Sequence, residues 1–379
     1  MCEKILVNLD SISVRFFSII ISLFATIYLI NMPLIMALAL RDLSLSQTEP
    51  LWLGGVFFIS FGLASVLLSF YNFLINMRRL ILISSIIGSI SFSLPLFLTS
   101  FEFLLVCQGL SGFFTGITCS VVFLVLGASK NPIRCYALVL CMQSFIVAII
   151  SYLLPPRAAE TITFNQALIF ASFLCFVSLI LARKIPSNIK ISKLKIEARQ
   201  GRQAVTQLLL FTLLLIFLGG NIVRNTIEPI AYSAGFYMVI LSVSSGIGAL
   251  IAALIEIRFN HTRPILISLG IAIIILSAGL LGHIPKQLTV VAFCMLSGAW
   301  NFSAAFVMGL FAKSTNNYNY IPLIISVQIL GNIVSLISVG SLKVGQPYIL
   351  GCIGWILAIL IISYIAKLNH KLFLVKNNE

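Results

Sequence analysis

The sequence contains little charge. Of its 379 residues, 9% are charged and 60% are hydrophobic, and the mean hydropathy is +1.12. A soluble globular domain carries about 25% charged residues, so this chain has too few charges to cover a surface in water. A bilayer removes that requirement, because lipid solvates the outside of the protein. The composition therefore indicates an integral membrane protein.

Acidic residues are especially scarce, with 10 against 24 basic residues and a net charge of +14. A strongly basic chain can bind nucleic acid, but such binding needs the cations gathered on one face. Here they are dispersed between apolar segments, so we expect no nucleic-acid partner. The pattern is instead typical of Lys and Arg collecting on the cytoplasmic side of a membrane protein.

Residue types that carry catalytic chemistry are few. The three histidines (His261, His283 and His370) lie near predicted helix ends, and none of the eight cysteines forms a C-x-x-C pair. The sequence contains no H-E-x-x-H, G-x-S-x-G or P-loop motif. We therefore expect no metal site, no cofactor and no enzymatic activity.

Long apolar runs take up most of the chain. A helix that spans a bilayer needs about 20 mainly apolar residues, whereas a barrel strand needs about 10 that alternate. Stretches such as Leu208 to Gly220 do not alternate, so the runs predict helices. Twelve are expected, at 14–40, 51–71, 80–98, 103–127, 134–154, 165–183, 206–226, 235–257, 264–284, 288–312, 320–342 and 347–367.

The distribution of positive charge predicts the orientation. If the N-terminus is cytoplasmic, 19 of the 24 Lys and Arg residues lie inside and 5 outside, as the positive-inside rule requires. We therefore expect a multi-pass protein of the cytoplasmic membrane with both termini in the cytoplasm. The first apolar run is too long for a cleaved signal peptide.

A basic segment divides the chain into two sets of six helices. Residues 184–205 hold six Lys and Arg residues up to Arg202 and one acid, Glu197. This segment is either regulatory or an amphipathic linker held near anionic lipid. Ser111-Gly112 recurs as Ser297-Gly298, 186 residues later. The sequence therefore predicts an all-α transmembrane fold with bundles at 1–183 and 206–379, related by a pseudo-twofold axis.

This organisation resembles the major facilitator superfamily of secondary transporters. The second loop of that family carries G-x-x-x-D-R-x-G-R-R/K, and here the window Phe70–Arg79 keeps the final Arg78-Arg79, with Leu74 at the Asp position. The fourth helix keeps Gln108-Gly109 of R-x-x-Q-G-x-G, with Leu105 at the Arg position. The resemblance implies transport by alternating access, and it implies a gating role for Arg78 and Arg79.

Helix breaks at matching places in two repeats are a pointer to a transport site. The first predicted helix carries Asn31 and Pro33, and its counterpart, the seventh, carries Arg224, Glu228 and Pro229. Arg224 and Glu228 lie one turn apart and can pair. They are either part of a site for an anionic solute or an interfacial pair at a helix end.

Polar residues within spans are the other candidates for substrate contacts. Gln108, Thr115 and Asn301 should face the interior of the protein, because polar groups facing lipid are costly. Each can equally serve as a hydrogen bond between helices. Gly109, Gly112 and Gly116 share one face of the fourth helix, which is either a sliding surface or a site of close packing.

We therefore expect a secondary active or facilitative transporter of a small solute, anionic or amphipathic in character, acting as a monomer in the lipid bilayer. No Asp, Glu or His lies deep in a span, so the proton is only a candidate coupling ion. A non-transporting membrane sensor or scaffold, and a membrane-embedded enzyme acting on lipid, are the alternative functions.

Overall fold

The computed structural model describes residues 11–46, 48–70, 76–98, 100–153, 162–187, 200–232, 236–255, 262–280, 288–315, 318–341 and 346–376. All regular structure in these residues is helical. The α-helices are α1 (Ile12–Ile30), α2 (Met32–Asp42), α3 (Glu49–Phe70), α4 (Met77–Ser93), α5 (Phe101–Gly127), α6 (Pro132–Leu153), α7 (Phe164–Leu181), α8 (Gln200–Tyr232), α9 (Phe236–Ile255), α10 (Thr262–Leu280), α11 (Thr289–Ser314), α12 (Leu323–Ser341) and α13 (Gln346–Lys376). Short 3-10 turns are η1 (Leu94–Leu96), η3 (Ala182–Lys184) and η5 (Tyr318–Tyr320).

Among the described residues, twelve helical segments are long and apolar enough to cross a membrane, which confirms the predicted number of spans. The first predicted run contains two helices, because α1 ends at Ile30 and α2 begins at Met32. Pro33 lies in the first turn of α2, where its missing N–H costs no helical hydrogen bond. The break predicted at Asn31 is thus confirmed.

The matching break in the seventh span is absent. Helix α8 continues without interruption through Pro229 to Tyr232, so the prediction of two symmetrical breaks is wrong. Proline is tolerated inside membrane helices, because neighbouring groups can satisfy the carbonyl that loses its N–H partner. A proline occurs in both spans, but only Pro33 lies next to a break between two helices.

Several helices begin at side-chain caps that the sequence encodes. The Ser11 hydroxyl accepts from the Val14 N–H at 3.1 Å, and the Asn76 side chain accepts from the Arg79 N–H at 3.1 Å. Helix α7 begins with a full capping box formed by Thr163 and Gln166. These contacts satisfy backbone donors that have no partner within the helix.

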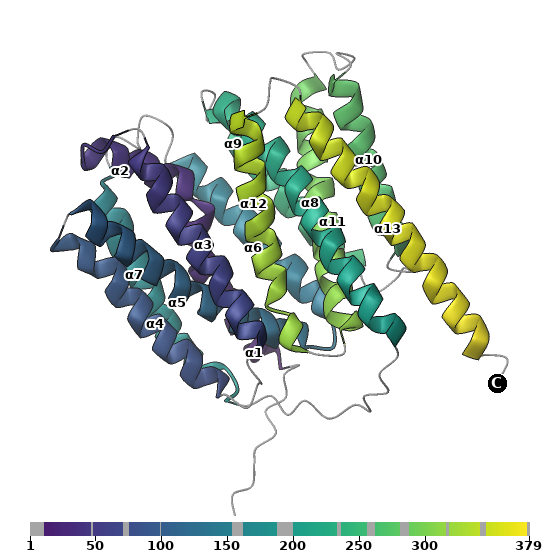
Figure 1. Cartoon of the computed structure of the whole chain (residues 1–379), viewed down its shortest axis with the longest axis horizontal. Helices are drawn as coiled ribbons and strands as arrows, with labels where there is room; N and C mark the ends of the chain where they lie inside the picture. Colours follow the sequence, from purple (N-terminus) through teal and green to yellow (C-terminus); the bar gives the residue numbers. More distant parts are fainter. Residues whose placement is uncertain are drawn as a thin grey trace, which may run out of the picture. The chain divides into compact units, whose positions relative to one another are not determined.

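The helices group into two compact units (Figure 1). The first unit contains α1 to α5, α7 and residues 318–326, and the second contains α8 to α11, α13, α6 from Tyr136 onward and α12 from Val327 onward. Most of α6 therefore packs with the helices of the second unit, although α6 is one of the first six spans in the sequence. The predicted bundles at 1–183 and 206–379 remain a prediction.

In the first unit, glycines allow α5 to lie directly against α3. A Cβ on Gly112 would lie 2.5 Å from the Phe57 carbonyl oxygen, and one on Gly116 would lie 2.6 Å from that of Phe61. Gly109, also on α5, faces Val56 of α3. The three glycines therefore share one face, as predicted, and that face is a site of close packing.

The second unit repeats this arrangement between α9 and α11. A Cβ on Gly298, the counterpart of Gly112, would lie 3.1 Å from the Ser244 carbonyl oxygen, and one on Gly248 would overlap the backbone of Gly298. A hydroxyl pair recurs as well. Ser84 contacts Thr118 at 2.7 Å between α4 and α5, and Ser268 contacts Ser303 at 2.6 Å between α10 and α11.

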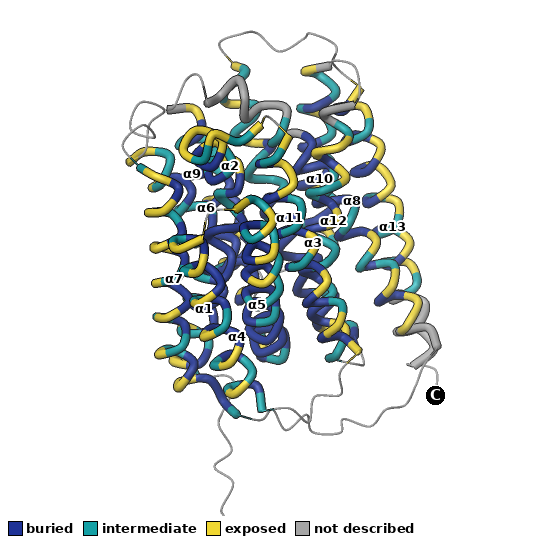
Figure 2. Tube along the Cα trace, turned by 60° about the vertical axis from the view of Figure 1, so that its left-hand side comes forward, coloured by how far each residue is buried: buried dark blue, intermediate teal, exposed yellow. Residues whose placement is uncertain are grey.

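Figure 2 shows exposed residues along the outer sides of the helices, and many of them are large apolar residues. Residues such as Ile83, Phe173, Ile274 and Leu360 are more than half exposed. In water such faces would aggregate, whereas lipid solvates them. The exposed faces therefore agree with the transmembrane character that the composition indicates.

Candidate functional site

Gln108 forms a buried polar contact inside the first unit. It lies on α5 with 2% of its surface exposed, and its Nε2 donates to the Tyr28 hydroxyl of α1 at 2.8 Å. Its Oε1 is buried without a hydrogen-bond partner among the described residues. If the amide were flipped, the nitrogen would be the atom left without a partner. Either way, one polar end of this side chain is unused.

Aromatic rings surround this contact. The Tyr28 ring centroid lies 5.1 Å from that of Phe57 on α3 and 4.7 Å from that of Phe92 on α4. An unsatisfied buried acceptor costs about 1–3 kcal/mol, and the Phe57 and Phe92 rings offer no donor. This arrangement therefore contains a hydrogen-bonding group that a hydroxyl-bearing or amine-bearing solute could use after a rearrangement.

Asn301 joins three helices of the second unit. Its Nδ2 donates to the Ser144 hydroxyl of α6 at 2.9 Å and to the Ser245 hydroxyl of α9 at 2.6 Å. Asn301 itself lies on α11 and is 6% exposed. The prediction that this polar residue faces the protein interior is confirmed. Ser144 and Ser245 belong to the same cluster, although the sequence analysis did not select them.

Thr115 and Asn31 use their polar atoms within their own helices. The Thr115 hydroxyl donates to the Ser111 carbonyl oxygen at 2.6 Å, one turn earlier on α5. Asn31 Nδ2 donates to the Ile27 carbonyl oxygen at 2.8 Å and so closes the end of α1. Both contacts satisfy local backbone groups, and a substrate role for either residue remains a prediction.

Arg224 lies on α8 and is half-buried. Glu228 is four residues further along the same helix, so the backbone allows the predicted pair, but the Glu228 side chain lies outside the described residues. The anion site at Arg224 and the interfacial pair therefore both stand as predictions.

Arg78 connects the beginning of α4 with the turn after α7. Its Nε donates to the Ile185 carbonyl oxygen at 2.8 Å, and the neighbouring Met77 N–H donates to the Ser187 carbonyl oxygen at 2.8 Å. Arg79 is exposed. The two arginines of the loop motif thus differ, because the Arg78 side chain binds another segment of the first unit whereas Arg79 faces outward.

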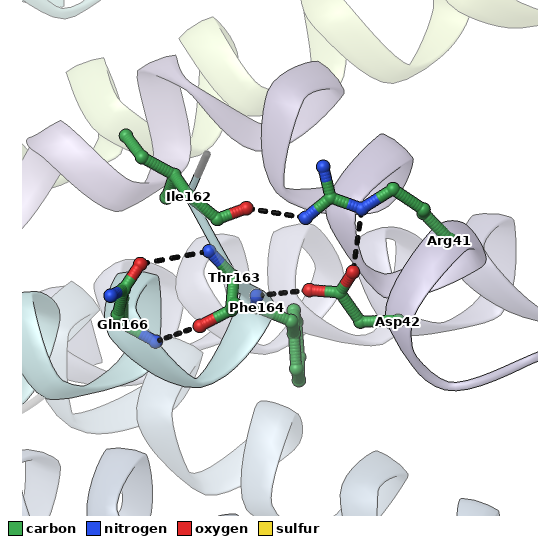
Figure 3. A network of polar contacts seen from close by, with 6 residues as sticks. All are labelled: Arg41, Asp42, Ile162, Thr163, Phe164 and Gln166. Carbon is green, nitrogen blue, oxygen red and sulfur yellow. Dashed lines mark hydrogen bonds and ion pairs between the residues drawn. The ribbon is translucent and has the colours of Figure 1, made fainter. Parts of the chain in front are cut away.

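A charged clasp joins the other ends of two helices in this unit (Figure 3). Arg41 Nε contacts Asp42 Oδ1 at 2.6 Å, Asp42 Oδ2 accepts from the Phe164 N–H at 2.6 Å, and Arg41 also donates to the Ile162 carbonyl oxygen. The hydrogen bond from Arg41 lowers the pKa of Asp42 most, and the Phe164 N–H lowers it further. The clasp therefore fixes the end of α2 to the first turn of α7.

Sequence reasoning missed two groups of residues. Tyr28 lies in an apolar run, and only its phenol distinguishes it from its neighbours. Arg41 and Asp42 carry no recognisable signal, because their partners Ile162 and Phe164 lie about 120 residues away in the sequence. Hydroxyl residues inside spans were the available signal for Tyr28, Ser144 and Ser245.

Comparison with known proteins gives a structural match without a sequence match. No protein-family model matches the sequence, and no curated protein gives a significant match. The fold is similar to the major facilitator superfamily transporter FucP in its outward conformation, with a TM-score of 0.71, 12% identity, and coverage of 94% of this chain and 99% of that chain. The chain has the fold of the major facilitator superfamily.

Two further structures have this fold. The proton:xylose symporter XylE bound to 6-bromo-6-deoxy-D-glucose has a TM-score of 0.68 at 13% identity, covering 93% of this chain and 95% of that one. A variant of the E. coli fucose:proton symporter FucP has a TM-score of 0.65 at 13% identity, covering 93% and 98%. The predicted all-α, twelve-span major facilitator fold is thus confirmed.

Proposed function

We propose that this protein is a secondary transporter that moves a small polar solute across a membrane by alternating access. The observation that carries the proposal is a major facilitator fold over 93–94% of the chain, matched to 95–99% of transporter structures. Two buried polar contacts inside the spans support it. The matched structures are all of transporters, which favours transport over a sensor, a scaffold or a lipid-acting enzyme.

The buried polar groups are candidates for solute contacts. Gln108 has an unused polar atom, and Asn301 holds hydroxyls of two other helices. Both side chains are buried here, so each would meet a solute in another conformation of the transport cycle. Asn31, Thr115, Arg224 and Glu228 complete the proposed set, with Arg224 favouring an anionic group on the solute.

We infer that the protein lies in the cytoplasmic membrane with both termini inside, and that it acts as a monomer. The unequal distribution of Lys and Arg supports this orientation. FucP and XylE are proton symporters, so the proton is the candidate coupling ion here as well. In this chain it would have to act near a helix end, because the described spans hold no deep carboxylate.

Reconstituted proteoliposomes test this function. The purified protein is first screened by thermal shift against sugars, organic acids, amino acids and amphipathic cations, and solutes that stabilise it are then offered as radiolabelled counterflow substrates. We expect saturable uptake of at least one solute, recovered unchanged. Binding without counterflow would favour a sensor, and recovery of a modified solute or lipid would favour an enzyme.

Proton coupling needs a separate measurement. With the substrate in hand, uptake is compared with and without an imposed pH gradient at constant membrane potential. Accumulation driven by the gradient would support symport or antiport. Equilibration to the same level in both conditions would mean facilitated diffusion.

A further inference from the structure

Helix α4 carries an exposed apolar stripe that ends in a cation. Ile83, Ile86 and Ile90 are 54%, 46% and 52% exposed, and Arg79 is exposed one turn before Ile83. Spacings of four, three and four residues place these four side chains on one face of the helix. The stripe therefore runs from the first turn of α4 into the span.

Helix α7 carries a similar stripe in the opposite direction. Phe173, Phe176 and Ile180 are 57%, 52% and 51% exposed. The turn η3 follows the helix directly and holds Arg183 and Lys184, both exposed. This second stripe therefore also ends in cations.

The two helices are neighbours in the first unit, as Figures 1 and 2 show. The Ser172 hydroxyl contacts those of Ser89 at 2.9 Å and Ser93 at 2.8 Å. At the charged end, the Arg78 contact with the Ile185 carbonyl oxygen joins α4 to the residue after η3. The two stripes and their terminal cations therefore form one continuous surface.

No acid among the described residues lies at this end of the unit. Its described carboxylates, Asp42, Glu49 and Glu102, lie at the end of α2 and the beginnings of α3 and α5, which is the opposite end of these antiparallel helices. Within the part of the chain that the structure describes, no carboxylate at this end compensates the positive charges of Arg79, Arg183 and Lys184. Because the apolar span ends there, these side chains lie at the depth of lipid headgroups.

We propose that this surface binds one anionic phospholipid. Its phosphate contacts Arg79, Arg183 and Lys184, and its acyl chains lie along Ile83 and Ile86 of α4 and Phe176 and Ile180 of α7. An isolated anion would meet only the cations, whereas a phospholipid matches both the charges and the apolar stripes. In the proposed orientation this lipid belongs to the cytoplasmic leaflet, where anionic lipids attract basic residues.

Native mass spectrometry of the detergent-purified full chain tests this site. The protein is titrated with phosphatidylglycerol, with phosphatidylcholine of the same acyl chains, and with glycerol 3-phosphate as the free headgroup. Each cation near an anionic lipid contributes about 1 kcal/mol, or about fivefold in affinity. We expect phosphatidylglycerol to bind about tenfold or more tightly than phosphatidylcholine, and raised salt to reduce the difference.

A triple variant and a charge-matched control locate the binding. Arg79→Gln with Arg183→Gln and Lys184→Gln should reduce phosphatidylglycerol affinity to the phosphatidylcholine level. Arg134→Gln with Arg263→Gln and Lys367→Gln removes three exposed cations elsewhere and should retain the preference. All six are exposed, so both variants should fold, and the thermal unfolding curve checks this.

Several outcomes would overturn the proposal. Equal losses in the two triple variants would mean attraction to net positive charge without a defined site. Equal affinities for the two phospholipids would mean that the surface binds acyl chains without recognising the charge of the headgroup. Competition by glycerol 3-phosphate at the same concentration as the lipid would indicate a site for a free anion. None of these measurements depends on transport, so failure here would leave the proposed function untouched.

Discussion

Hydroxyl side chains make most of the polar contacts within the spans. Thr26, Ser111 and Thr115 donate to carbonyl oxygens one turn earlier on their own helices. Such contacts satisfy a polar group without a partner on another helix. Gln108 and Asn301 are different, because their amides donate to side chains of other helices. This difference makes them better candidates for function than the serines and threonines.

The clasp of Arg41 and Asp42 should depend on pH. The pKa of Asp42 is below its ordinary value in the folded protein, so its contribution to stability is complete above the unfolded-state pKa of 3.8. That contribution disappears as the pH falls through the lower folded-state value. Because both residues are exposed, we expect Asp42→Asn to cost at most about 1 kcal/mol at pH 7.

Thermal unfolding in detergent at pH 7 and at the lowest pH the protein tolerates measures this effect. The melting temperatures of wild type and Asp42→Asn should converge as the pH is lowered. Glu49→Gln serves as the control carboxylate at the same end of the unit. A difference that stays constant with pH would show that the Asp42 charge does not stabilise the clasp.

Substitution of Arg224 distinguishes an anion site from a helix-end pair. The guanidinium binds a carboxylate through two parallel hydrogen bonds, whereas lysine supplies charge alone. If a carboxylate-bearing substrate binds there, Arg224→Lys should raise its Kd about tenfold or more, the value of one charged hydrogen bond. Binding measured by isothermal titration or scintillation proximity gives the change. Near-wild-type affinity in both Arg224→Lys and Arg224→Gln would exclude the anion site.

At the scale of elements, glycines determine how closely α3 and α5 approach. Gly112→Ala would place its Cβ 2.5 Å from the Phe57 carbonyl oxygen, and a backbone atom cannot move aside as a flexible side chain can. We expect a loss of about 1–3 kcal/mol, the usual cost of overpacking. The melting temperature and the yield of monodisperse protein report it.

Gly55 provides the matched control on α3. A Cβ there meets nothing within 4 Å, so Gly55→Ala should be neutral or stabilising by about 0.4–1 kcal/mol through reduced entropy of the unfolded chain. If both alanine variants behaved alike, the distance between α3 and α5 would not be set by Gly112.

Arg78 should matter more than Arg79 for transport. The Arg78 side chain holds the turn after α7 against the beginning of α4, while Arg79 is exposed. Arg78→Ala removes a charged hydrogen bond worth about 1 kcal/mol at a half-exposed site. We expect slower counterflow with unchanged membrane insertion, and a smaller effect from Arg79→Ala in the same lipid. Equal counterflow rates for wild type and Arg78→Ala would mean that Arg78 contributes only to the orientation of the protein in the membrane.

The sequence predicted the individual helices better than it predicted how the helices group into units. Apolar length alone located all twelve spans, because a bilayer sets the number of residues a helix needs. Pro33 correctly predicted the break at Asn31, but Pro229 wrongly predicted a break in the seventh span. Whether a helix continues through a proline depends on neighbouring groups that can satisfy the freed carbonyl, and hydropathy does not describe these groups. The partners of α6 and of the first residues of α12 also depend on packing over long sequence separations. For the candidate site, the sequence identified Gln108 and Asn301 as inward-facing but could not identify Tyr28, Ser144 or Ser245.

At the scale of the whole molecule, hydropathy and charge determine different properties. The apolar runs determine that the chain crosses the membrane, but they do not determine which side of the membrane each loop lies on. Among the described residues of the first unit, Arg79, Arg183 and Lys184 lie at one end, and the carboxylates lie at the other end together with Arg41. This distribution agrees with a single orientation of its helices. Direction therefore depends on Lys and Arg alone, and it can be tested without knowledge of the substrate.

The orientation predicts that residues 184–205 are cytoplasmic. Lys195 lies in this segment, outside the described residues, and a cysteine there can be tested with a membrane-impermeant maleimide. We expect Lys195→Cys to react in lysed cells or inverted vesicles and to remain unlabelled in intact cells, because 19 of 24 cations lie on the same side in this arrangement. Wild type corrects for its own cysteines, of which the seven described are mostly buried. A cysteine at Arg157, predicted to be outside, should show the reverse pattern. Labelling of Lys195→Cys in intact cells, with Arg157→Cys protected, would invert the topology and place the proposed phospholipid in the outer leaflet.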